Sequence, residues 1–166
     1  LPVIEVFKAK YKLDKLVVVA DAGLLSNANV QELQSKQYEY ILGARIKNEK
    51  DSIKRQLLAL SLENGQSAEL VRDEHTKLIV SYSESRAKKD AANRKKGLQK
   101  LERSIVRGKL TKQNINNRGY NKYLQLNGDV QISINYDKYD ADQKWDGLKG
   151  YITNTKMNKE EVIVNY

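Results

Sequence analysis

The apolar residues of this chain follow different periods in different segments, and the clearest segment is an unbroken apolar stretch over residues 16–20, LVVVA, which ends at Asp21. An apolar stretch without alternation is typical of a strand that is covered on both faces, as in the middle of an α/β sheet. The pattern therefore places Asp21 at the carboxyl end of a strand, where open α/β sheets hold their chemistry.

Asp21 has two interpretations. Aspartates in this position commonly only close a turn or cap the next helix. Ser26 and Asn27 are better placed to cap the segment that follows, in which the apolar residues Val30 and Leu33 are three positions apart. A helix that starts there leaves the Asp21 carboxylate free for another partner, while the turn-closing role stays open as the alternative.

The first 67 residues alternate between helical and strand-like patterns. Helices are predicted over residues 1–11, 28–36 and 51–60, and strands over residues 15–20 and 38–46. The order strand, helix, strand predicts a parallel pair of strands joined by a right-handed crossover.

From about residue 68 the α/β repetition stops. The sequence predicts two short strands around a turn at residues 74–76, a helix over 83–108, a hairpin around Asn127-Gly128 and a strand over 148–155. Asn158, with Glu161 three residues later, predicts the start of a last helix. We therefore expect an α/β fold with a core in residues 1–67, an insertion in 68–146 and a return to the core in 147–166.

The net charge of +9 narrows the class of partner. A chain this basic favours a polyanion, and nucleic acid over an anionic membrane surface, although a soluble protein that is simply rich in lysine remains the alternative. No apolar stretch approaches the ~20 residues of a membrane span, so we expect no membrane partner. The absence of cysteine fits a reducing compartment such as the cytoplasm.

The predicted helix over 83–108 holds most of the candidate DNA-binding charges. They spread over more than one face, which suits sequence-independent contacts to phosphates better than base reading, and an ordinary solvated face is the alternative. Four tyrosines further along either stack on splayed bases or pack beside strands. The charges are Arg86, Lys88, Lys89, Arg94, Lys95, Lys96, Lys100, Arg103 and Arg107, and the tyrosines are Tyr120, Tyr123, Tyr136 and Tyr139.

Five segments in this order, VVVADAGLLS, YILGARI, ESRAKKDAANRKKGLQKLE, WDGLKGYITNT and EEVIVNY, together resemble the DDE transposases of bacterial insertion sequences. The resemblance implies a partial RNase H-like core, interrupted between the second and third acids by a largely β insertion that carries the long basic helix. It also implies an enzyme in which three carboxylates bind two Mg²⁺ (or Mn²⁺) ions and cleave and transfer DNA strands. The implied partners are transposon ends, target DNA and a second copy in a homodimer, in the bacterial cytoplasm.

Two residues match this family's site motifs. Asp21 matches the second acid, and Tyr166 matches the tyrosine of the motif Tyr, two residues, Arg, three residues, Glu, six residues, Lys. The first acid has no counterpart, and the rest of the motif would follow Tyr166. Arg45, just past the second strand, is a candidate to reach a phosphate near Asp21. With one acid of three we expect the chain alone to bind Mg²⁺ weakly and to cleave no DNA.

The rival interpretation is a non-catalytic basic α/β module that binds nucleic acid or mediates assembly. In a regulatory domain of this kind Asp21 would be a phosphoacceptor, which calls for a second pair of acids near an earlier strand. The sequence shows no such pair before Asp21.

Overall fold

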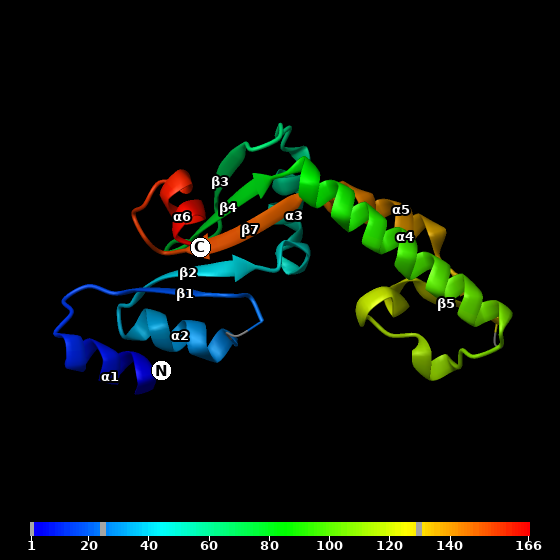
Figure 1. Ribbon diagram of the computed structural model, residues 1–166, viewed down its shortest axis with the longest axis horizontal. Helices are drawn as coiled ribbons and strands as arrows, with labels where there is room; N and C mark the ends of the chain where they lie inside the picture. The colour runs from blue at the N-terminus through cyan, green and yellow to red at the C-terminus, as the bar shows by residue number, and fades with distance from the viewer. Residues whose placement is uncertain (1, 24–25, 129–130) are drawn as a thin grey trace. The chain divides into compact units, whose positions relative to one another are not determined.

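The computed structural model describes residues 2–23, 26–128 and 131–166 (Figure 1). The chain forms two compact units. Unit 1 comprises the residues up to Ser83 together with Leu148–Tyr166, and unit 2 comprises Glu84–Gly147.

Unit 1 is built on a mixed five-stranded sheet in the order β1-β2-β7-β4-β3 (Figure 1). Strands β1 and β2 are parallel, as predicted, and every other neighbouring pair is antiparallel. The fold is therefore mixed α/β, with parallel and antiparallel strands in one sheet. The strands are β1 (Val17–Ala20), β2 (Glu39–Ala44), β3 (Ser67–Val71), β4 (Lys77–Tyr82) and β7 (Leu148–Thr153).

The helices of unit 1 lie within a few residues of their predicted positions. The Ser26 hydroxyl accepts a hydrogen bond from the backbone N–H of Asn29 (3.3 Å), so Ser26 caps the second helix as predicted. The helices are α1 (Pro2–Tyr11), α2 (Asn27–Ser35), α3 (Asp51–Ala59) and α6 (Lys159–Asn165), with a 3₁₀ turn η1 (Ile46–Asn48) after β2.

Both faces of the sheet are covered, because successive side chains of a strand point to opposite faces. On one face Tyr40 and Leu42 of β2 pack with Leu33 of α2. On the other face Ile41 packs with Val162 of α6. The buried core of unit 1 therefore lies in two layers, one on each face of the sheet.

Strand β1 differs from the prediction, because it is the outermost of the five strands rather than a central one. Its side chains are half-buried, and Val19 is 43% exposed. An unbroken apolar stretch reports coverage of the two faces of a strand, and it carries no information on how many strands pair beside it.

Unit 2 is mainly helical, in contrast to the largely β insertion that was expected. Leu101 of its long helix packs with Tyr123, Leu124 and Ile134 in a separate core. Its elements are α4 (Glu84–Val106), η2 (Lys112–Asn114), η3 (Gly119–Tyr123), the antiparallel hairpin of β5 (Leu124–Asn127) and β6 (Gln131–Ile134), α5 (Tyr136–Ala141) and η4 (Asp142–Trp145).

The boundary between the two units lies at Ser83–Glu84, whereas the sequence placed the start of the insertion near residue 68. Strands β3 and β4 account for the difference, because β4 pairs with β7 and so joins the sheet of unit 1. A second difference is α5. The second strand of the hairpin predicted around Asn127-Gly128 was expected to run over 130–136, but β6 ends at Ile134 and Asn135 caps a helix by accepting from the N–H of Lys138 (2.8 Å).

Candidate functional site

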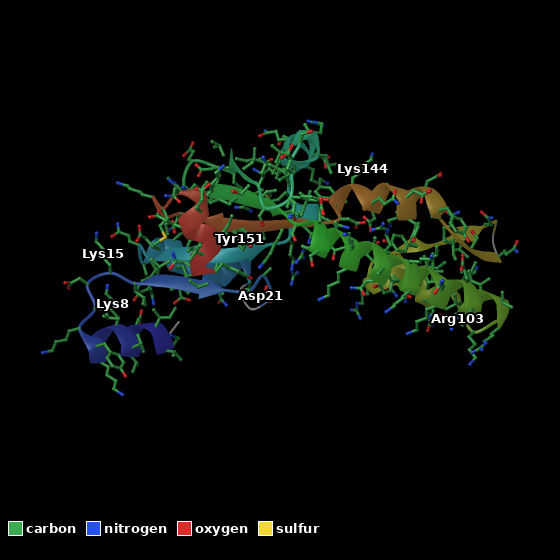
Figure 2. The ribbon with its side chains drawn as sticks, turned by 45° about the horizontal axis from the view of Figure 1, so that its top comes forward. Lys8, Lys15, Asp21, Arg103, Lys144 and Tyr151 are labelled. Carbon is green, nitrogen blue, oxygen red and sulfur yellow. The ribbon has the colours of Figure 1, made fainter. Side chains whose placement is uncertain are left out.

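Asp21 lies directly after β1, at its carboxyl end, as predicted (Figure 2). Its Oδ1 atom accepts two hydrogen bonds, one from the backbone N–H of Ala22 (2.7 Å) and one from the hydroxyl of Tyr166 (3.1 Å). Because both donors meet Oδ1, the carboxylate is held in one orientation. Oδ2 has no partner among the residues that the structure describes.

Helix α6 brings Tyr166 to this carboxylate. The helix begins with a reciprocal capping box, in which the Asn158 side chain accepts from the N–H of Glu161 and the Glu161 side chain accepts from the N–H of Asn158, each at 2.8 Å. Buried Val162 anchors the helix on the sheet. The Tyr166 ring then packs edge-to-face against Tyr151 of β7, with ring centroids 4.9 Å apart.

Gly43 of β2 provides the space for this contact. A Cβ atom at this position would lie 2.5 Å from the Tyr166 hydroxyl oxygen, 2.9 Å from the backbone N of Ala22 and 3.2 Å from Asp21 Oδ1. The sequence carries one signal for this role: Gly43 is a glycine inside the predicted strand over residues 38–46, and such a glycine marks a close approach of another group.

A cavity of about 730 Å³ opens beside Asp21. Arg45, just past β2, lines the same cavity, and it forms no ion pair within the described residues. Arg72, also in the lining, is paired with Glu49 through Nε (3.0 and 3.1 Å). Glu49 and Asp73, the other two acids of the lining, are both bonded to Arg72, so the cavity offers the Asp21 carboxylate, an unpaired guanidinium and several amides to a polar ligand. Its other lining residues include Ser26, Gln31, Gln34, Asn48 and Asp73.

The described residues do not fit a complete Mg²⁺ site. Within them no group of three or more His, Cys, Asp or Glu side chains could hold a metal ion. Asp21 supplies one carboxylate, and Mg²⁺ held by a single carboxylate keeps most of its water.

The basic residues of α4 differ in burial and in ion pairing. Arg94 is 7% exposed, and its guanidinium donates to Asp146 and lies over the Tyr139 ring, so it is not available to a phosphate. A signal for this was present in the sequence: Arg94 is in phase with Leu98 and Leu101 on the apolar stripe. Arg86 pairs with Asp90 at 3.6 Å. The remaining candidates are exposed: Lys88, Lys89, Lys95, Lys96, Lys100, Arg103 and Arg107.

The tyrosines of unit 2 also differ in burial: two pack in the core and two are partly exposed. Tyr123 is 2% exposed and its hydroxyl donates to Asp142 (2.6 Å), so it packs in the core. Tyr139 packs edge-to-face against it. Tyr120 and Tyr136 are partly exposed, and the Tyr136 hydroxyl donates to Glu102 (3.1 Å).

Comparisons of this chain with protein-family models, with curated proteins and with solved structures give no match. Among the described residues, no helix has both the length and the apolar character needed to cross a bilayer.

The Tyr166 contact predicts a measurable pH effect. Burial raises the pKa of Tyr166, and the hydrogen bond to Asp21 and its negative charge raise it further. Replacing Asp21 by Asn is expected to lower the pKa of Tyr166 toward its ordinary value, measured by NMR titration of the tyrosine ¹³Cζ signals, with Tyr166→Phe to assign the signal. Asp14→Asn, at an exposed acid of the same unit, is the control.

The sign of the linked stability follows from the direction of the shift. A phenol whose pKa is raised by folding stabilises the fold fully below its unfolded pKa of about 10 and loses that contribution as pH rises through the folded pKa. The difference in unfolding free energy between the parent protein and Asp21→Asn should therefore shrink above about pH 10. An unchanged Tyr166 pKa in Asp21→Asn would contradict the contact.

Proposed function

We propose that this chain is the part of a DDE transposase that carries the second catalytic acid, Asp21, on an RNase H-like core. The observation that supports the proposal is the hydrogen bond from Tyr166 to Asp21. The resemblance matched these two residues to two separate motifs of one active site, and they are 145 positions apart in the chain. Their contact supports the assignment of both residues to one site.

The chain's own residues would act by positioning. Tyr166 and the Ala22 N–H hold Oδ1 of Asp21, so that Oδ2 is presented in a fixed orientation to a ligand. Arg45, which lines the same cavity, would neutralise a DNA phosphate brought next to the carboxylate. Strand cleavage would need further carboxylates beside Asp21, because one carboxylate does not make a two-metal site.

The test is strand cleavage by the full-length product of the gene that encodes this chain. The substrate is a plasmid that carries the gene with its flanking DNA, and the assay contains Mg²⁺ or Mn²⁺. We expect cleavage at sites that flank the gene, and a loss of about 10³-fold in rate on Asp21→Asn, since a catalytic acid contributes several kcal/mol.

Asp14→Asn is the matched control and should retain cleavage, because Asp14 is an exposed acid of the same unit. The 166-residue chain alone should show none. Cleavage that survives Asp21→Asn, or a full-length protein that does not cleave, would overturn the proposal. A second function, nucleic-acid binding without catalysis, is favoured by the exposed charges of α4.

A further inference from the structure

Four basic residues of α4, together with the residue that follows the helix, fall on one stripe of its surface. They are Lys89, Lys96, Lys100, Arg103 and Arg107. Their spacings of seven, four, three and four residues keep them within about 60° around the helix axis at 3.6 residues per turn. Arg107 continues the stripe past the end of α4, because its N–H donates to the Arg103 carbonyl (3.1 Å). We call this set the cationic stripe; Arg103 is labelled in Figure 2.

The cationic stripe lies opposite the packed side of α4. Leu98, Leu101 and Ile105, which pack in the core of unit 2, are on the far side of the helix from it. All five cations are exposed, and none forms an ion pair within the described residues. Elsewhere in the described chain many cations are paired, including Lys36 with Glu5 and Lys77 with Glu69.

The acids of α4 are kept away from the stripe. Asp90 accepts from the backbone N–H of Gly147 (3.2 Å), and Glu102 accepts from the Tyr136 hydroxyl (3.1 Å). By the helical repeat, these two residues and Glu84 lie about 80° or more from its edges. The stripe is therefore a surface of one sign, which attracts a polyanion.

The geometry points to the phosphate backbone of duplex DNA as the partner of the cationic stripe. The stripe is about 27 Å long at 1.5 Å per residue, which equals the rise of about eight base pairs along the duplex axis at 3.4 Å each. An anionic membrane is disfavoured, because the apolar side that a membrane-binding helix would insert is already packed in unit 2. A single strand is disfavoured, because no aromatic residue for base stacking belongs to the stripe.

This inference does not rest on the proposed function, since binding through the stripe needs neither Asp21 nor cleavage. The experiment measures anisotropy of a labelled 30-base-pair duplex of arbitrary sequence with the 166-residue protein over a series of NaCl concentrations. If all five cations meet phosphates, log K against log[salt] has a slope of about −4.5.

Two double variants make the test specific. Lys96→Gln with Lys100→Gln removes two charges of the stripe and should reduce the slope by about 1.8, with weaker binding to every sequence. Lys88→Gln with Lys95→Gln removes two exposed charges of the same helix outside the stripe and should leave the slope unchanged. Circular dichroism with thermal unfolding checks that both variants fold.

Three results would overturn the inference. Equal losses in the two double variants would mean that only net charge matters. Absence of duplex binding at 50 mM NaCl would show that the cationic stripe does not bind duplex DNA. Tighter binding to phosphatidylserine vesicles, to poly-dT or to duplex RNA than to duplex DNA would assign the stripe to another partner.

Discussion

Replacing Asp146 by Ala is expected to lower the unfolding free energy of unit 2 by about 3–5 kcal/mol, because it leaves a buried charge without its partner. Arg94 is 7% exposed, its Nη1 donates to Asp146, and its buried Nε has no hydrogen-bond partner among the described residues. Burial acts to lower the pKa of Arg94, but the hydrogen bond and charge of Asp146 raise the pKa above its usual value. The guanidinium therefore stays charged and depends on this carboxylate.

Trp145 offers the probe for this measurement. It is the only tryptophan of the chain and belongs to unit 2, so its fluorescence during urea unfolding reports on that unit. Asp140→Ala is the matched control: Asp140 is an exposed acid of α5, and its loss should change stability by no more than about 0.5 kcal/mol.

A second comparison separates the unpaired charge from simple loss of contact. Arg94→Met combined with Asp146→Leu removes both charges and should recover most of the lost stability, since replacing a buried pair by apolar groups is often neutral. A loss below about 1 kcal/mol in Asp146→Ala would show that the pair does not hold unit 2 together, and no recovery in the double variant would show that the loss comes from missing contacts rather than from the unpaired charge.

The features that could be predicted from the sequence depend on neighbours within a few residues. Ser26 and Asn158 cap helices through contacts three residues away, and both are seen. Gly108, expected to end the long helix, and Gly128, expected in the hairpin turn, both have positive φ (62° and 60°). Only glycine adopts such angles without cost, so these signals are specific.

The features that could not be predicted depend on partners far along the chain. A short apolar strand looks the same whichever sheet it joins, so β4, whose partner β7 begins at Leu148, was placed in the insertion. The position of Arg94 in phase with Leu98 and Leu101 indicates that it is buried, but its ion pair could not be predicted, because the partner Asp146 is 52 residues away. Asp21 was placed correctly by its strand, whereas its contact with Tyr166 required the sheet to be assembled.

Gly43 shows how closely the site depends on such packing, and Gly43→Ala is expected to destabilise unit 1 by about 1–3 kcal/mol through overpacking. The added Cβ would lie 2.5 Å from the Tyr166 hydroxyl oxygen and 2.9 Å from the Ala22 nitrogen. The tyrosine ring can swing away, but the Ala22 nitrogen is backbone and moves only with the turn that holds Asp21. Both shifts break the hydrogen bond to Asp21, so the pKa of Tyr166 should fall toward its ordinary value.

A double-mutant cycle tests whether Gly43 makes room for Tyr166. Tyr166→Phe removes the hydroxyl that a Cβ at Gly43 would meet first, so Gly43→Ala should cost less in the Tyr166→Phe background than in the parent protein. Urea unfolding measures each corner of the cycle. Gly23→Ala is the control, because a Cβ there meets no atom of the described residues within 4 Å. Equal costs of Gly43→Ala in both backgrounds would mean that the Ala22 backbone alone excludes a side chain, and that β2 and α6 are not coupled through the Tyr166 hydroxyl.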